Sequence, residues 1–286
     1  MRENFDIHEF NITIIGLGLL GGSYAKSLKK LSPKNIWAVD IDEKALKDGE
    51  ELGVINKGYR DPKEPLLNSD MVIICLYPNL VKKFIKDNKD YFRPNTIITD
   101  ATGIKNGLID DINSMLPEDV DFVFGHPMAG REKKGLEYSS AEVFEGANYI
   151  LTPNSRNKET SLLIVELIVR GMGFRNVVRV DPQKHDEIIS FTSQLPHAIA
   201  VALINSDNLN VNTGKFIGDS YRELTRIANI NAELWSELFI GNKDNLISKI
   251  EVFEEKMKLI KQAIIDDDKE ALEREFKESS RRRTQL

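Results

Sequence analysis

The chain has 286 residues, 41% of them hydrophobic, which suffices for two domains with sizeable cores. Its formal net charge is −6 and acidic and basic residues are interleaved, so no basic face for nucleic acid is expected. No unbroken apolar run approaches the roughly 20 residues of a membrane span, and the charged start is no signal peptide, so we expect a soluble, cytoplasmic protein without a membrane partner. The four histidines and the single cysteine show no metal-ligand spacing.

The first predicted elements form a dinucleotide-binding unit. A β-branched strand is followed at once by Gly16-x-Gly18-x-x-Gly21 and an apolar helical pattern. Gly16 permits the tight turn, Gly18 lets backbone N–H groups approach a pyrophosphate, and Gly21 lets the helix pack close to the strand. We therefore predict that NAD binds with its phosphates at the start of this helix, against the backbone of Leu19 and Leu20.

An acidic residue ends the next predicted strand. Asp40 follows that strand, 19 residues beyond Gly21. A carboxylate there can accept both ribose hydroxyls of the adenosine and would repel a 2′-phosphate, which predicts NAD in preference to NADP. Asp42 either shares this role or caps a helix over 43–52. The alternative for the whole segment is a glycine-rich turn that binds no ligand.

Strands and helical patterns alternate up to about residue 180. The predicted strands lie at 36–39, 70–75, 96–99, 120–124, 148–152 and 177–180. This alternation is typical of an α/β fold with a Rossmann-like, mainly parallel sheet covered on both faces. From Asp181-Pro182, a good N-cap and first-turn pair, the segments become long and amphipathic. We predict an NAD-binding domain over 1–181 and an all-α domain over 182–286.

A histidine follows the strand predicted at 120–124. His126 is expected in a turn fixed by Pro127 and opened by Gly130, at a strand end, where open α/β sheets bind ligands. Imidazole has an unperturbed pKa close to neutrality, so His126 is a candidate catalytic group. The alternative is that His126 is only a turn residue.

The second domain has polar residues inside an apolar helical stretch. Pro196 must free backbone carbonyls and kink the helix beside His197, which suggests a site. His185 and Asp186 are expected to be a surface or capping pair, with a functional role as the alternative. Arg226 stands between apolar neighbours and needs an anionic partner, either an acid of its own chain or a substrate carboxylate or phosphate.

The apolar residues of the second domain exceed what a monomer needs. A helical domain of about 105 residues is small for an independent core, and the apolar positions over 188–204 are generous. We therefore expect a homodimer through this domain; packing against the first domain is the alternative. Trp235 is expected mainly to pack in the core and only secondarily to line the site. The tail 281–283 is expected to be a frayed, solvated terminus.

Four motifs, in this order, resemble those of the prephenate and arogenate dehydrogenase family. They are GLGLLGGS at 16–23, GHPMAG at 125–130, SQLPHAIA at 193–200 and TRIA at 225–228. The resemblance implies a nucleotide-binding domain, a helical dimerisation domain and an active site in the cleft between them. It also implies an NAD-dependent oxidation of a small cyclohexadienol with loss of carbon dioxide. Prephenate would give 4-hydroxyphenylpyruvate, and arogenate would give tyrosine.

The resemblance also implies roles for single residues. His126 matches the family's catalytic histidine, which would accept the proton of the substrate's C4 hydroxyl with an apparent pKa of about 6.5. Arg226 matches a carboxylate-binding arginine and His197 a second site histidine. Glu132 matches an acidic residue at the cleft; a solvated loop charge is the alternative.

The chain departs from the family at one position of this site. The family commonly has D-x-G-S-x-K, whose serine hydrogen-bonds the reacting hydroxyl, whereas this chain has DATGIK at 100–105, with Gly103 at the serine position. We expect Thr102 to supply the hydroxyl; the alternative is that Thr102 and Gly103 serve only the turn. Two other classes stay open, a β-hydroxyacid-type dehydrogenase and a non-enzymatic NAD-binding protein.

Overall fold

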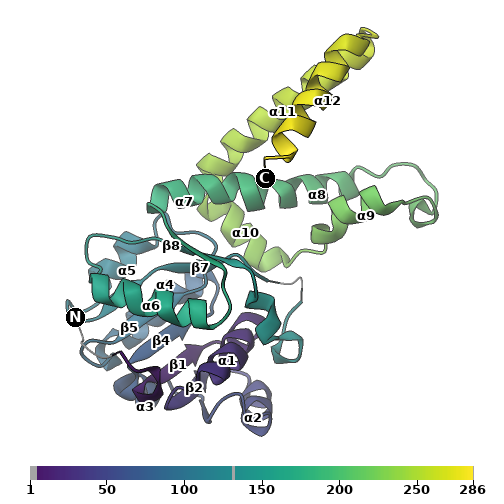
Figure 1. Ribbon diagram of the computed structural model, residues 1–286. Helices are drawn as coiled ribbons and strands as arrows, with labels where there is room; N and C mark the ends of the chain where they lie inside the picture. The colour runs from purple at the N-terminus through teal and green to yellow at the C-terminus, as the bar shows by residue number, and fades with distance from the viewer. Residues whose placement is uncertain (1–4, 131–132, 286) are drawn as a thin grey trace.

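In a computed structural model, which describes residues 5–130 and 133–285, an α/β domain carries a helical domain at one end (Figure 1). The main sheet has six parallel strands. Their order across the sheet is β3 (Lys57–Tyr59), β2 (Asn35–Val39), β1 (Asn11–Ile15), β4 (Met71–Ile74), β5 (Ile97–Asp100) and β6 (Asp121–Val123). The order reverses between β1 and β4, and open sheets bind ligands outside such a switch point.

Helices cover both faces of this sheet, which confirms the predicted Rossmann-like fold. One face packs against α1 (Leu19–Leu31), α2 (Glu43–Glu51) and α6 (Glu159–Gly171). The other packs against α3 (Lys63–Asn68), α4 (Pro78–Asn88) and α5 (Ile109–Met115). Side chains alternate along β1, so Ile12 and Ile14 lie in the first core and Ile15 lies in the second.

A second, smaller sheet departs from the expected single sheet. It consists of β7 (Gly125–Pro127), antiparallel to β8 (Asn148–Leu151), which is parallel to β9 (Asn176–Arg179). The strands predicted near 148–152 and 177–180 therefore belong here. His126 lies in β7 opposite Ile150, and the turn expected around it is wrong. Both β3 and β7 have three residues, too few for a strand periodicity to show in the sequence.

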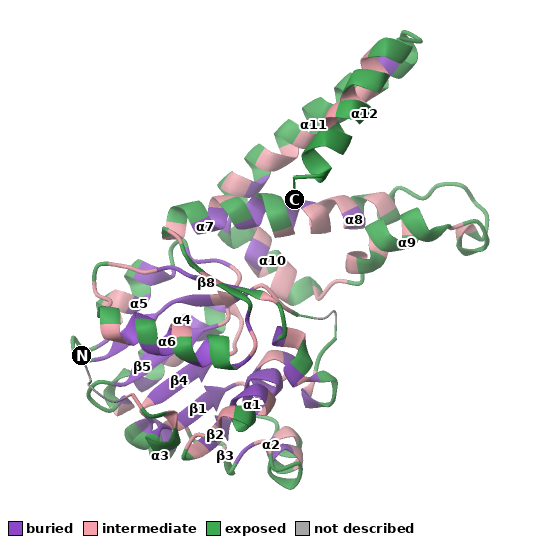
Figure 2. Ribbon diagram, in the orientation of Figure 1, coloured by how far each residue is buried: buried purple, intermediate pink, exposed green. Residues whose placement is uncertain are grey.

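The second domain consists of helices and the loops between them over its described residues. It comprises α7 (Pro182–Ile189), a π-helical turn (Ser190–Gln194), α8 (Leu195–Asn205), α9 (Asp219–Thr225), α10 (Ala232–Gly241), α11 (Lys243–Ile265) and α12 (Lys269–Arg283). The α11–α12 hairpin projects away from the sheet, and most of its residues are exposed (Figure 2). The tail at 281–283 is the last turn of α12 and not a frayed end, because Arg281 and Arg282 pair with Glu278 along the helix.

One apolar helix is longer than the sequence suggested. Among the described residues, the continuous helix 182–205 is long and apolar enough to cross a membrane by length and composition, with a mean hydropathy of 1.3 over its most apolar part. Only 28% of that part is buried. The sequence shows no unbroken apolar run of this length because polar residues such as Asp186 and Gln194 interrupt it, and both of these are buried. The helix therefore has a polar buried face and much exposed apolar surface.

Candidate active site

The turn between β1 and α1 has the shape that a dinucleotide needs. Gly16 has a φ of +88°, which L side chains rarely adopt, and a Cβ there would lie 2.8 Å from the carbonyl oxygen of Cys75. A Cβ at Gly21 would lie 1.8 Å from the carbonyl oxygen of Gly16. Both positions therefore require glycine, and α1 can start directly against the end of β1.

Gly18 is different, because the protein itself leaves room for a side chain. A Cβ built there meets nothing within 4 Å. Gly18 is the N-cap of α1 and no side chain caps the helix, so the first N–H groups, on Leu19 and Leu20, have no capping side chain. Helix N-termini bind anions through these groups. A pyrophosphate fits this turn, and its close approach explains a glycine that packing does not require.

Asp40 lies beside the same turn. Its carboxylate accepts the N–H of Leu17 at 2.6 Å and the N–H of Asp42 at 2.8 Å. A carboxylate offers about four acceptor positions, so it can also accept ribose hydroxyls. Asp42 instead caps α2, where it accepts the N–H groups of Lys44 and Ala45. Of its two sequence readings, the structure therefore shows the cap.

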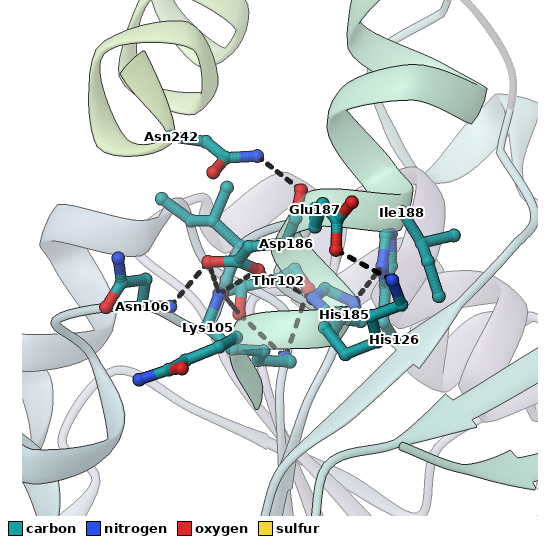
Figure 3. Close-up of polar contacts among 12 residues, drawn as sticks. Thr102, Lys105, Asn106, His126, His185, Asp186, Glu187, Ile188 and Asn242 are labelled. Carbon is teal, nitrogen blue, oxygen red and sulfur yellow. Dashed lines mark hydrogen bonds and ion pairs between the residues drawn. The ribbon is translucent and has the colours of Figure 1, made fainter. Parts of the chain in front are cut away.

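A chain of hydrogen bonds joins the two domains at His126 (Figure 3). His126 Nδ1 lies 3.0 Å from His185 Nε2, and His185 Nδ1 lies 2.6 Å from Asp186 Oδ1. His185 and Asp186 belong to α7 and are fully buried. The surface or capping pair expected here is therefore wrong: this face of α7 packs onto the first domain, and each buried group is hydrogen-bonded.

Asp186 is held from both domains. Its carboxylate accepts the backbone N–H of Lys105 at 2.9 Å and that of Asn106 at 2.7 Å, both in the segment after β5. The amide of Asn242 donates to the carbonyl oxygen of Asp186 at 2.8 Å and to Gln194 Oε1 at 2.9 Å. The carboxylate of Asp186 therefore cannot turn without breaking its hydrogen bonds to the 105–106 backbone, and Asn242 holds the Asp186 backbone from the second domain.

A buried ion pair fixes the backbone next to His126. Lys105 Nζ donates to Asp100 Oδ2 and to the carbonyl oxygen of Gly125, both at 2.7 Å, and neither charged side chain is exposed. Asp100 Oδ1 accepts the N–H of Gly125 at 2.9 Å. The pair thus binds both polar backbone groups of the residue before His126. Sequence reasoning gave Asp100 and Lys105 no role, although both stand in the run that drew attention to Thr102.

Thr102 belongs to this ion-pair cluster. Its hydroxyl has one proton to donate and lies within hydrogen-bond distance of two acceptors, Asp100 and the carbonyl oxygen of Ile104, and it accepts from Lys105 at 3.0 Å. The residue that faces His126 is Gly103, where a Cβ would lie 3.7 Å from His126 Nε2. This arrangement favours the turn role of Thr102 over the catalytic one.

Helix α10 connects His126 to the second histidine of the candidate site. Leu238 of α10 contacts the Cβ position of Gly103, and Trp235, one turn earlier, stacks on His197 with ring centroids 3.6 Å apart. His197 Nδ1 lies 2.8 Å from the carbonyl oxygen of Ser193. Trp235 is only partly buried, so it serves as a site wall more than as core.

Of the other two predicted site residues, only Arg226 belongs to the described part of the chain. Arg226 opens a 3₁₀ turn over residues 226–228 that packs against α8, the helix of His197. Glu132 lies outside the described residues. The helix irregularity predicted at Pro196 is a π-helical turn that precedes it. In this turn the N–H of Leu195 donates to the carbonyl oxygen of Ser190.

The surroundings of His126, which is partly buried, and of His185, which is fully buried, favour the neutral form of both histidines. Burial, with His185 and the Lys105 ammonium as smaller causes, lowers the pKa of His126 well below its usual value. Burial also lowers the pKa of His185, although the hydrogen bond to Asp186 opposes this. A neutral His126 is the form that can accept a proton. The apparent pKa expected near 6.5 therefore moves to lower pH.

Comparisons with known proteins identify the family. Residues 24–178 match the family model described as prephenate dehydrogenase, nucleotide-binding domain, and residues 181–278 match prephenate dehydrogenase, dimerization domain. The chain belongs to the prephenate dehydrogenase family. It is therefore an oxidoreductase with a nucleotide-binding domain, as the glycine-rich turn predicted.

Similar proteins cover nearly the whole chain. Prephenate dehydrogenase of Bacillus subtilis is 29% identical over 93% of this chain and 73% of its own length. Cyclohexadienyl dehydrogenase of Zymomonas mobilis is 26% identical over 96% of both. The crystal structure of prephenate dehydrogenase from Aquifex aeolicus, in complex with hydroxyphenyl propionate and NAD⁺, is 30% identical, with a TM-score of 0.88 over 96% of this chain and 98% of that one.

Proposed function

We propose that this chain catalyses the NAD-dependent oxidative decarboxylation of prephenate to 4-hydroxyphenylpyruvate, as a cytoplasmic enzyme of tyrosine biosynthesis. The observation that carries the proposal is the position of His126, held at the domain junction by His185 and Asp186 with its Nε2 facing Gly103. Relatives named prephenate dehydrogenase support the substrate. Arogenate is the second candidate, because one relative is named a cyclohexadienyl dehydrogenase and another a probable arogenate/prephenate dehydrogenase.

Different residues bind the cofactor and accept the proton in this reaction. NAD supplies the acceptor for the hydride that leaves C4 of the substrate. Gly16, Gly18 and Gly21, together with Asp40, bind NAD at the turn between β1 and α1. His126 Nε2 accepts the proton of the C4 hydroxyl, so that the oxygen can form the phenol of the product as carbon dioxide leaves C1. Aromatisation of the ring drives the step.

The substrate carboxylates need cationic partners from the helical domain. The planar guanidinium of Arg226 can hold a carboxylate bidentately. His197 contacts the substrate from the Trp235 side. We propose the domain boundary at residue 181, between the N-terminal residues that would hold the cofactor and the C-terminal residues that would bind the substrate.

We also propose that the chain forms a homodimer through its helical domain. The matching family model is described as a dimerization domain. The largely exposed apolar surface of the helix 182–205 and of the α11–α12 hairpin gives this domain much more apolar area than its own fold covers.

The test of the activity is formation of NADH with prephenate, with arogenate and with a panel of β-hydroxy acids. We expect turnover with prephenate, and a kcat that falls in acid with an apparent pKa below the usual value of about 6.5. His126→Asn cannot take the proton, so kcat should drop roughly 10²- to 10⁴-fold. Arg226→Ala should chiefly raise KM. Turnover of β-hydroxy acids alone, or a near wild-type kcat in His126→Asn, contradicts the proposal.

A further inference from the structure

The hydrogen bonds around Asp186 determine where each proton of the histidine chain lies. A carboxylate only accepts hydrogen bonds, and here both oxygens accept backbone N–H groups, from Lys105 and Asn106. The 2.6 Å contact between His185 Nδ1 and Asp186 Oδ1 therefore has its proton on His185 Nδ1. Since His185 is neutral, its other nitrogen, Nε2, has a lone pair and accepts.

The same reasoning determines the tautomer of His126. His185 Nε2 accepts, so the proton in the 3.0 Å contact belongs to His126 Nδ1. The lone pair of His126 then lies on Nε2, the atom that faces the Cβ position of Gly103. Without this chain, a neutral imidazole could carry its proton on either nitrogen. The tautomer with its proton on Nε2 cannot act as a base at that nitrogen.

We propose that His185 and Asp186 form a positioning and proton-holding pair, which keeps His126 in the Nδ1–H tautomer and takes over its Nδ1 proton during turnover. The second half of this inference rests on the proposed function. As the substrate O–H bond breaks, a bond forms between that proton and His126 Nε2. The His126 Nδ1–H bond then breaks and a bond between that proton and His185 Nε2 forms, so the positive charge ends on His185. As carbon dioxide leaves and the ring becomes aromatic, the transfers reverse: His126 Nε2 returns its proton to the phenolate oxygen of the product, and the proton on His185 Nε2 goes back to His126 Nδ1.

Electrostatics favours the charge on His185 over His126. The charged groups that face the histidines are Asp186 from α7 and, from the end of β5 and the segment after it, Lys105 and Asp100. The Lys105 ammonium disfavours a cation on either ring. Only His185 is in direct contact with a carboxylate, at 2.6 Å. A positively charged His185 would form a buried ion pair with Asp186, whose carboxylate already accepts hydrogen bonds.

Asp186→Asn tests the tautomer directly. The side-chain oxygen of the new residue can still accept from the 105–106 backbone, while its NH₂ group would donate to His185 Nδ1. His185 would then carry its proton on Nε2 and donate to His126 Nδ1, which moves the His126 proton to Nε2. The chain has four histidines, so ¹⁵N NMR of labelled protein can read each ring. We expect His126 as Nδ1–H in the wild type and as Nε2–H in the variant.

The kinetic readout follows from the tautomer. Asp186→Asn should lower kcat roughly 10²- to 10⁴-fold, as loss of the correct tautomer does in triads of this type, while the affinity for NAD stays unchanged. Glu187→Gln is the matched control, because it removes the neighbouring charge, which lies on the exposed side of α7 and pairs with Lys184 and Lys249. We expect wild-type kcat and wild-type histidine spectra for the control.

His185→Gln separates the two halves of the inference and serves if Asp186→Asn does not fold. A glutamine can accept the Nδ1–H of His126 but cannot hold an extra proton. We expect the wild-type tautomer of His126 with a kcat lowered about tenfold or more. A wild-type kcat in His185→Gln overturns the proton transfer.

The outcomes also distinguish this inference from the proposed function. An unchanged His126 tautomer in Asp186→Asn overturns the positioning role, whatever the substrate. A wild type inactive with prephenate and arogenate overturns the proposed function, and with it the transfer during turnover, but the NMR result still decides the tautomer.

Discussion

A single carboxylate at the end of β2, that of Asp40, is the residue to which we assign the choice of cofactor at the glycine-rich turn. Two backbone N–H groups hold Asp40 in place, so it cannot swing away from an approaching anion. A 2′-phosphate beside Asp40 would meet like charge. Arg60, which follows the neighbouring strand β3, is already paired with Glu43 at 2.5 Å. The charges at this edge of the sheet therefore favour a cofactor with free ribose hydroxyls.

Asp40→Ser should narrow the preference for NAD over NADP. Two like charges about 4 Å apart near a protein surface repel by a few kcal/mol, so we expect the ratio of the two kcat/KM values to fall roughly tenfold or more. Asp42→Ser is the control, since serine can still cap α2 and the ratio should stay the same. Equal efficiency with both cofactors in the wild type contradicts the role of Asp40.

At the level of elements, the contact between α1 and β1 shows two glycines with different reasons to be glycine. Gly21 is needed by the fold, because any side chain would collide with the backbone of the preceding turn. Gly18 is not needed by the fold, because its Cβ direction is open. We attribute Gly18 to the ligand and Gly21 to the packing of the helix.

Alanine at each position should separate these reasons. Gly21→Ala should destabilise the protein by about 1–3 kcal/mol through overpacking, seen as a melting temperature several degrees lower. Gly18→Ala should leave the melting temperature of the protein alone unchanged and weaken NAD binding, measured by titration calorimetry. Loss of stability in Gly18→Ala, with unchanged NAD affinity, contradicts this assignment.

The elements that the sequence predicted are those with local signals. The glycine spacing after β1 and the caps at Asp42 and Asp181 depend on residues a few positions apart, and all appear in the structure. The partners of His126 could not be predicted, because His185 lies 59 residues away and is brought near only when α7 packs onto the first domain. The role of Lys105 could not be predicted either. Its partner Asp100 is near in the sequence, but the burial of this ion pair depends on the tertiary fold.

At the scale of the whole molecule, the helical domain has unmatched apolar surface. Figure 2 shows buried residues concentrated in the sheet and mostly exposed residues along the α11–α12 hairpin. Among the exposed apolar side chains of this hairpin are Val252 and Met257 of α11 and Phe276 of α12. Apolar surface left exposed to this extent is typical of a protein interface.

A dimer through this surface should depend on those side chains. We expect the wild type to have the mass of a dimer in light scattering after gel filtration, because burying this surface removes apolar area from water. The double variant Val252→Glu/Phe276→Glu should dissociate at concentrations at which the wild type stays dimeric. Leu167→Glu, an exposed position on α6 of the first domain, is the control and should leave the mass unchanged. A wild-type monomer, or dissociation in the control alone, contradicts a dimer through the helical domain.

The bonds from Asp186 to the backbone at 105–106 bear on how freely the two halves of such an enzyme can be exchanged. A nucleotide-binding half cut free at the proposed boundary, residue 181, would retain all the residues proposed to bind the cofactor. It has lost the acid that orients its histidine, however. A chimaera with a foreign helical half could acquire a new substrate pocket only from a donor that brings its own histidine–aspartate pair to the same junction. The contact between the two domains at Asp186 would therefore have to be transferred together with the helical domain.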